Sequence, residues 1–106
     1  MNNKTSLTAP QKRLLETLQR TNFGRIERLA VRDGQPVFDP APRIVKDVKL
    51  GNPDNEARPE LKAIDFILKR EHLDLFENLS KFGTGTIEAI EIRHGLPFRI
   101  LFEQQP

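Results

Sequence analysis

The sequence predicts an α+β protein of two helix-plus-β-hairpin (αββ) repeats related by a pseudo-twofold axis, with the helices packed on one side of an antiparallel sheet. The first observation is that residues 14–38 recur without a gap as residues 75–99, with nine identities in 25 positions. The second is that each copy passes from helical spacing of apolar residues to strand-like alternation ending in a glycine turn. Because neither unit can bury its apolar face alone, we expect the two copies to pack together.

The repeated positions are mostly apolar, turn and strand residues. Similar pairs keep the same register as the identical ones, for example Leu29/Ile90 and Val31/Ile92. A repeat of this length is typical of one supersecondary unit that has been copied. The identical pairs are Leu14/Leu75, Glu16/Glu77, Leu18/Leu79, Gly24/Gly85, Ile26/Ile87, Glu27/Glu88, Arg32/Arg93, Gly34/Gly95 and Pro36/Pro97.

The first helix is expected over about residues 9–20. Thr8 and Gln11 form a capping-box pattern, and Pro10 lies in the first turn, where its missing N–H is no loss. The helix should end before Asn22 and Gly24. Its apolar stripe consists of Leu14, Leu15 and Leu18.

A β-hairpin is expected after each helix, with turns at Asp33-Gly34 and at His94-Gly95. Apolar residues from Ile90 to Phe102 share one parity, which favours a three-residue loop that pairs Ile92 with Leu96. We expect this loop in both copies, with glycine at positive φ.

Two further features recur in both hairpins. Ile26 and Ile87 are out of phase with the apolar residues that follow them, which predicts a bulge near Glu27 and Glu88. A proline, Pro36 or Pro97, lies in each returning strand, and since proline cannot donate a ladder hydrogen bond, its nitrogen should face an open sheet edge.

The middle of the chain departs from the repeat. Residues 43–50 are expected to form an extra strand with Ile44, Val48 and Leu50 on one side, followed by a loop over 51–59. Helical spacing returns from Glu60, although the repeat requires a helix only over about 70–81. Residues 61–68 are either part of that helix or a separate short element. Gly83 should close the helix.

Length and composition fit a single domain over residues 1–106, with repeat 1 at about 8–50 and repeat 2 at about 60–104. The chain has no cysteine, which excludes disulfides, a thiol nucleophile and thiolate metal sites. The N-terminal residues lack the apolar run of a signal peptide, and no stretch approaches the length of a membrane span. We therefore expect a cytoplasmic protein without a membrane partner.

No residue pattern predicts catalysis, a cofactor or a metal. The glycines follow the helices and precede strands, the reverse of the phosphate-binding order. His72 is expected to pack in the helix stripe and His94 to occupy a turn. Glu27 and Glu88 form a repeated carboxylate pair that could serve acid–base chemistry or bind a metal, but a bulge position with solvated or backbone-bonded carboxylates is the interpretation we adopt. We expect no enzyme.

Positive charge is concentrated in the first half of the chain. Residues 1–58 carry 11 basic and 7 acidic side chains, whereas residues 59–106 carry 6 and 8. This asymmetry suggests a basic face that could track nucleic-acid phosphates, although the chain has no tyrosine or tryptophan for stacking. The candidate contacts are Arg28, Arg32, Lys46 and Lys49.

The repeated unit resembles the small bacterial YezD-like proteins, which are single helix-plus-hairpin chains without an assigned function. The first copy carries the resemblance at Leu14, Leu18, Phe23, Gly24, Ile26, Arg32, Asp33, Gly34 and Val37, and the second at Leu75, Leu79, Gly85, Ile87, Arg93, His94 and Gly95. The resemblance covers about half of the chain and implies a fused tandem of a unit that would otherwise dimerise. It carries over no catalytic residue.

The function expected from these observations is a non-catalytic module that binds a partner protein or self-associates through a sheet edge. The alternative is a nucleic-acid-binding regulator that uses the basic first half.

Overall fold

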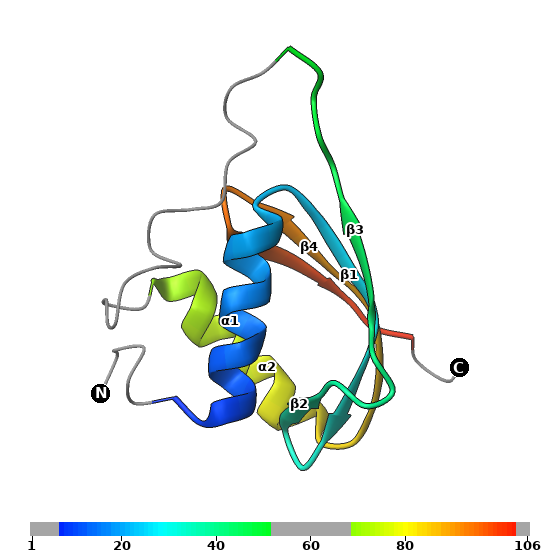
Figure 1. The fold of residues 1–106 in the computed structure, drawn as a ribbon. Coiled ribbons are helices and arrows are strands. Elements are labelled where there is room, and N and C mark those ends of the chain that lie inside the picture. The colour runs from blue at the N-terminus through cyan, green and yellow to red at the C-terminus, as the bar shows by residue number, and fades with distance from the viewer. Residues whose placement is uncertain (1–6, 52–68, 104–106) are drawn as a thin grey trace.

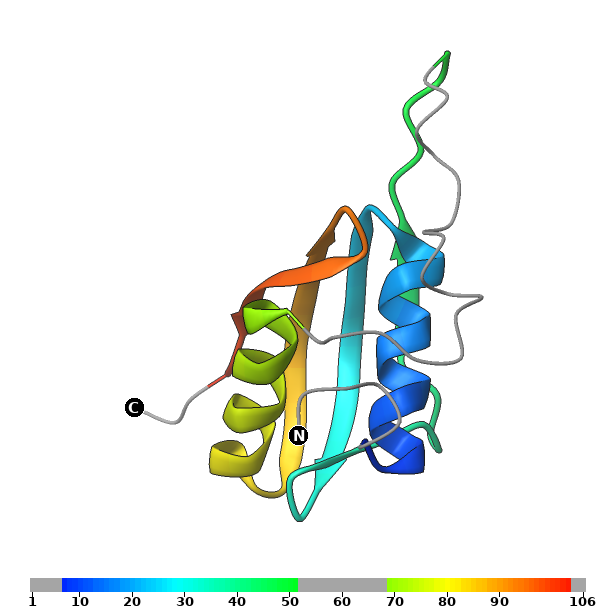
Figure 2. The ribbon, with the colours of Figure 1, turned by 90° about the vertical axis from the view of Figure 1, so that its left-hand side faces the viewer.

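The computed structural model describes residues 7–51 and 69–103, which form one antiparallel sheet with two helices against one face (Figures 1 and 2). This α+β architecture is the predicted one. In Figure 2, α1 lies over the β3 side of the sheet and α2 over the β4 and β5 side. The described elements are α1 (Ala9–Thr21), β1 (Gly24–Arg32), β2 (Gln35–Val37), β3 (Arg43–Lys46), α2 (Arg70–Phe82), β4 (Gly85–Arg93) and β5 (Leu96–Leu101).

Both helix ends of α1 form as the sequence predicts. The hydroxyl of Thr8 accepts the N–H of Gln11 at 3.3 Å, and the Gln11 side chain accepts the N–H of Thr8 at 3.0 Å. This capping box satisfies N–H groups that have no partner within the helix. At the other end Asn22 takes a positive φ of 66° and donates its N–H to the Leu18 carbonyl. Gly83 closes α2 in the corresponding way, at φ 84°.

The sheet is built around β1 and β4, which pair along their whole lengths. The strand order is β2-β1-β4-β5, and β3 also pairs with β1. β2 and β3 share one edge of β1, with β2 opposite Ala30–Arg32 and β3 opposite Gly24–Glu27. Between them, Pro40 and Pro42 interrupt the extended segment, because proline cannot donate to a ladder.

The core lies between the helices and the covered face of the sheet. Each helix contributes leucines and each central strand contributes isoleucine, leucine or valine, so the apolar faces of both halves are buried against each other. Partly buried phenylalanines surround it. The core residues are Leu14, Leu18, Ile26, Leu29, Val31, Leu75, Leu79, Ile87, Ile90 and Ile92.

The prediction of three-residue hairpin loops is wrong. Arg32 pairs with Gln35 and Arg93 pairs with Leu96, which leaves two-residue loops at 33–34 and 94–95. Both central residues of each loop have positive φ: 51° and 78° in the first, 55° and 73° in the second. These angles match the type I′ turn, whose twist fits that of the flanking strands, and Asp-Gly is a preferred sequence for it.

An irregularity in β5, and not a longer loop, accounts for the shared parity of the apolar residues. Ile92 pairs with Pro97, but Glu91 pairs with Arg99, so Phe98 is an extra residue between two pairs of the ladder. After this bulge Ile100 again faces the core, while Phe98 is left 42% exposed. A bulge therefore preserves the apolar face that a longer loop was expected to preserve.

The phase change in the two central strands is present. Ile26 and Leu29 are both buried with two residues between them, as are Ile87 and Ile90. Arg28 takes a positive φ of 60°, which is uncommon for a residue with a side chain. However, the β1–β4 register runs from Glu27↔Ala89 to Leu29↔Ile87 without a shift, so no extra residue is inserted between these strands.

The extra strand is shorter than predicted. It spans Arg43–Lys46, and residues 47–50 continue beyond the sheet as an irregular segment that projects from it in both views (Figures 1 and 2). Val48 is exposed and Leu50 is 95% exposed, so the expected apolar side of 43–50 is not buried among the described residues. The predictions for 52–59 and 61–68 lie outside the described residues.

Each hairpin turn contacts the end of the helix in the other half. Gly34 donates its N–H to the Gly83 carbonyl at 2.8 Å, and Gly95 donates to the Asn22 carbonyl at the same distance. A side chain at Gly34 would also press against the backbone of Ser80 in α2. The turns thus satisfy carbonyl groups at the helix ends, as well as reversing the chain.

Candidate functional site

The outer edge of β3 presents backbone groups that no described strand pairs with. Asp47 donates its N–H to the Phe23 carbonyl at 2.7 Å, which fixes which residues of this segment face β1. Because alternate residues of a strand bond to the same side, Arg43 and Val45 bond to β1. Ile44 and Lys46 therefore direct their N–H and C=O groups away from the sheet.

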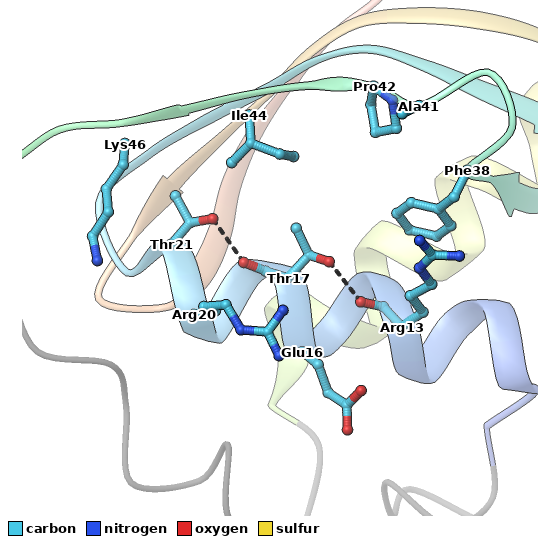
Figure 3. Close-up of a pocket in the computed structure, with 10 residues that line it drawn as sticks. All are labelled: Arg13, Glu16, Thr17, Arg20, Thr21, Phe38, Ala41, Pro42, Ile44 and Lys46. Carbon is cyan, nitrogen blue, oxygen red and sulfur yellow. Dashed lines mark hydrogen bonds between the residues drawn. The ribbon is translucent and has the colours of Figure 1, made fainter.

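A groove of about 540 Å³ lies between this edge and α1 (Figure 3). Ile44 extends from β3 toward the helix, and Phe38 and Pro42 continue the apolar wall from the preceding segment. Ile44 is 45% exposed because α1 does not cover it. The other lining residues are Arg13, Glu16, Thr17, Arg20, Thr21, Ala41 and Lys46.

The hydroxyl groups of the groove floor are already bonded within the helix. Thr17 donates to the Arg13 carbonyl at 2.8 Å and Thr21 donates to the Thr17 carbonyl at 2.7 Å, as Figure 3 shows. Both hydroxyl groups therefore already donate their protons to helix carbonyl groups. Selectivity in the groove must then come mainly from its apolar wall and from the charges at its rim.

The rim carries three cations and one carboxylate. Arg13 places its guanidinium 4.5 Å from the centre of the Phe38 ring, and Glu16 supplies the negative charge. Within the described part of the chain, neither Arg20 nor Lys46 has a carboxylate within ion-pair distance. The groove is therefore apolar inside and positive at its rim.

Each of the other two edge strands carries a proline that blocks one position of pairing. In each hairpin the residues beside the turn form the hydrogen-bonded pair, so the next residue, Pro36 in β2 or Pro97 in β5, directs its nitrogen outward. The strand order confirms the prediction that these prolines lie in edge strands. Proline at such a position removes the donor that an added strand would need. β3 has no proline.

The uncovered face of the sheet carries a row of alternating charges. Arg43 in β3 lies 3.5 Å from Glu27 in β1, and Glu27 accepts a 2.5 Å hydrogen bond from Arg25. Arg25 pairs in register with Glu91, which lies 3.4 Å from Arg99 in β5. The hydrogen bond from Arg25, with the charges of Arg25 and Arg43, lowers the pKa of Glu27 below its ordinary value, and burial opposes this only in part.

The repeated carboxylates are engaged by arginines on this exposed face. Glu88 lies 3.4 Å from Arg28, and Glu27 is held by Arg25 and Arg43. Neither carboxylate is among the described residues that line the groove beside α1, the hollow around Gly24 or the hollow between α2 and β5. The described residues also contain no group of three or more histidine or acidic side chains placed to hold a metal ion. Both carboxylates therefore form ion pairs on the exposed face of the sheet.

The predicted nucleic-acid contacts are spread along the length of β1. Arg32 lies at the turn end of β1, whereas Lys46 pairs with Gly24 at the other end, which places them about 26 Å apart along the strand. Arg28 lies between these ends, and Lys49 belongs to the projecting segment. The four residues do not form one patch, although Lys46 and Lys49 line the same hollow.

The two histidines occupy the predicted kinds of position. His72 is buried in the stripe of α2, and its Nδ1 accepts the Lys69 N–H at 3.1 Å, which closes the start of the helix. His94 lies in the second hairpin turn, with its ring edge-on to Phe23 at 4.8 Å between centres.

Sequence reasoning did not find the groove. Arg13, Arg20 and Phe38 lie on two elements, and only the return of β3 along β1 brings them opposite Ile44. The one feature of the sequence that points to the groove is the strand at 43–46. These residues have no counterpart in the repeat and carry basic residues at both ends.

Comparison with protein-family models, curated proteins and solved structures finds no match to this chain. Neither described helix is long and apolar enough to span a membrane.

Proposed function

We propose that this protein is a binding module that captures an extended acidic segment of a partner protein by β-strand addition to the outer edge of β3. The observation that carries the proposal is the combination of unpaired backbone groups at Ile44 and Lys46 with a groove beside them. In strand addition, main-chain hydrogen bonds supply affinity, and pockets for alternate side chains supply specificity.

The groove determines which side chains the added strand would present. Residues directly opposite Ile44 and Lys46 point to the same face as those two side chains, toward α1. An apolar residue fits opposite Ile44, against Phe38. An acidic residue two positions away fits opposite Lys46, within the positive rim. The ligand is therefore an extended segment with an apolar and an acidic residue at alternate positions.

A second copy of the chain is a poorer occupant of this edge. Antiparallel pairing of two β3 strands through their outward-facing residues can set Lys46 of one copy directly opposite Lys46 of the other. Like charges across a strand pair are destabilising, whereas an acidic strand is attracted. The charged edge thus disfavours self-pairing and favours a complementary partner.

We also propose that the two halves are tandem copies related by a pseudo-twofold axis, as the YezD-like resemblance implies. Three features support this. The helices and strands of the halves begin 61 residues apart, as in Ala9 and Arg70 or Gly24 and Gly85. The same offset converts the pair Gly24↔Ile92 into Val31↔Gly85. The same offset also relates the hydrogen bond from Gly34 to the Gly83 carbonyl to the one from Gly95 to the Asn22 carbonyl. β3 is then an addition to the first copy that creates its binding edge.

The strand-addition proposal is tested by selecting from a displayed library of random peptides on the intact protein. We expect enriched peptides to carry an acidic and an apolar residue two positions apart. Binding of a fluorescent enriched peptide should weaken roughly tenfold in Ile44→Pro, which removes an outward N–H but none of the bonds to β1. Arg20→Glu should weaken it as well, with a reduced dependence on salt.

Ile44→Val is the matched control, since it keeps both the N–H and an apolar side chain and should bind like the wild type. Circular dichroism checks that each variant is folded. Equal affinities of Ile44→Pro and Ile44→Val, or enrichment of peptides without acidic residues, would contradict the proposal. If the protein forms a concentration-dependent dimer and the selection enriches no peptide, the occupant of the β3 edge is a second copy of the chain.

A further inference from the structure

A second hollow, of about 830 Å³, lies at the end of the sheet where β1 begins and β4 runs into its turn. Gly24 pairs with Lys46 on one side and with Ile92 on the other, so three strands meet at this point. The segment after β3 adds Asp47 and Lys49 to the lining. The hollow is within the volume range of sites for small molecules and cofactors.

Aromatic rings line this hollow from three elements: Phe23 from before β1, His94 from the second turn and Phe98 from the bulge in β5. The two-residue turn sets Pro97 opposite the buried Ile92, so the next residue, Phe98, faces the uncovered side of the sheet beside Glu91. The Arg93 guanidinium lies 4.5 Å from the centre of the Phe98 ring. Planar groups stack on guanidinium and aromatic faces, so this pair is a platform for another flat ring.

Positive charge exceeds negative charge in the lining. The carboxylate of Glu91 lies 3.4 Å from Arg99, and Arg25 is bonded to Glu27, so these charges are neutralised locally. Within the described ranges, Lys46 and Arg93 have no carboxylate at ion-pair distance. Asp47 is the remaining acidic side chain of the hollow. A ligand with an anionic group is attracted to the cationic side chains of this lining, such as Arg93 and Lys49.

We propose that this hollow binds a nucleotide, either free or within a single strand of nucleic acid. The base stacks on the Arg93–Phe98 pair, and the phosphate is bound by the positive lining, to which the segment after β3 contributes Lys49. This arrangement combines a stacking platform with an electrostatic contact, which is how proteins bind single-stranded nucleic acid without reading its sequence. Lys46 and Lys49, both candidate contacts from the sequence, belong to this site, whereas Arg28 and Arg32 do not line it.

The proposal is independent of strand addition, although Lys46 lines both sites. The groove beside α1 is formed by Phe38, Pro42 and Ile44, which are absent from the second hollow. The two sites can therefore be disabled separately. Ile44→Pro should leave nucleotide binding at the level of the wild type.

The test measures binding of fluorescently labelled oligouridylate and of AMP to the intact protein at low and high salt. Phe98→Ala and Arg93→Gln should each weaken binding roughly tenfold, since each removes half of the stacking platform. Lys49→Gln should weaken it and reduce its salt dependence. Backbone NMR signals of Gly24, Val45 and His94 should shift on binding, and those of Gly34 should not. Binding of AMP assigns the site to free nucleotides, and binding of the oligonucleotide alone assigns it to single strands.

Arg32→Gln is the matched control, because Arg32 is an exposed arginine at the opposite end of β1. It should bind both probes like the wild type. If Arg32→Gln weakens binding as much as Arg93→Gln, the attraction is general to the basic surface and the site is refuted. The absence of binding by either probe at low salt also overturns the proposal. Phe98→Ala removes a partly exposed side chain, and Arg93→Gln tests the same platform without changing the core. A loss of binding in both variants is therefore not explained by a loss of folding.

Discussion

At the scale of single residues, Gly24 determines whether β3 can lie against β1. Its φ of 146° is a conformation that residues with a side chain rarely adopt. A Cβ at this position would overlap the carbonyl oxygen of Val45, which belongs to the paired backbone of β3. The glycine that the sequence repeats therefore has a specific role in the first half, because both proposed sites depend on the position of β3.

Gly24→Ala should destabilise the protein by about 2–4 kcal/mol, because backbone strain and a clash with a paired strand combine. Gly83→Ala is the control: it has φ 84° but nothing within 4 Å of a new Cβ, so it should cost about 1–2 kcal/mol. Denaturant unfolding monitored by far-UV circular dichroism measures both. Equal losses would show that the contact with Val45 adds nothing to the strain.

Glu27 should make folding stability sensitive to acid. Its pKa is lowered mainly by the hydrogen bond from Arg25, so the folded state favours the ionised carboxylate more than the unfolded state does. The resulting stabilisation is present above the ordinary pKa of 4.5 and is lost as the pH falls through the lower folded value. In Glu27→Gln, unfolding midpoints measured at neutral and acidic pH should differ less than in the wild type. An unchanged difference would mean that other carboxyl groups dominate.

At the scale of secondary-structure elements, the sequence predicts what depends on local patterns and misses what depends on neighbours. The capping box at Thr8, the end of α2 at Gly83 and the edge positions of Pro36 and Pro97 follow from local rules, and the structure confirms them. The bulge at Phe98 was missed, since a longer turn and a bulge both restore the parity of the apolar residues. A local pattern of apolar residues cannot distinguish a longer turn from a bulge, because either one restores the alternation.

The candidate sites were predictable only in part for the same reason. Lys46 and Lys49 were selected by charge, and they line the second hollow. The shared parity from Ile90 to Phe102 predicted that Phe98 would face the same side as Ile90, but Phe98 lines the second hollow. Its placement depends on the register of the second hairpin, and that of the groove depends on where β3 lies, which is long-range information that periodicity does not contain.

Thr8→Ala should lower the free energy of unfolding by about 1 kcal/mol, because the α1 N-terminus loses the hydroxyl that accepts from Gln11. The same hydroxyl donates to the Gln35 side chain at 2.7 Å, so the change also loosens the contact of α1 with β2. Thermal unfolding measures the loss. Lys12→Ala, in the same turn region, should change stability by less than about 0.5 kcal/mol; a similar loss in both variants would contradict a capping role.

At the scale of the whole molecule, the two halves have no separate cores. β1 and β4 are central neighbours, and their buried residues belong to one cluster with leucines from both helices. Each helix end is also bonded to the turn of the other half. We therefore expect one cooperative unfolding transition, because damage in either half removes contacts from both.

Leu18→Ala and Leu79→Ala should each cost about 2–5 kcal/mol, since both leucines are fully buried. In hydrogen-exchange mass spectrometry, Leu18→Ala should reduce protection in β4 as much as in β1, and Leu79→Ala should do the same in reverse. Loss of protection confined to the mutated half would show that the halves unfold independently.

The crossed hydrogen bonds between turns and helix ends have a consequence for synthesis of the chain. The carbonyl of Asn22, at the end of the first helix, receives its hydrogen bond from Gly95, in a chain of 106 residues. β1 likewise lacks its central partner until residues 85–93 have been made. Until then the nascent first half lacks the contacts that α2 and β4 make with it in the folded protein. The complete core can form only after the C-terminal hairpin has been made, and transiently exposed apolar surface of this kind favours aggregation.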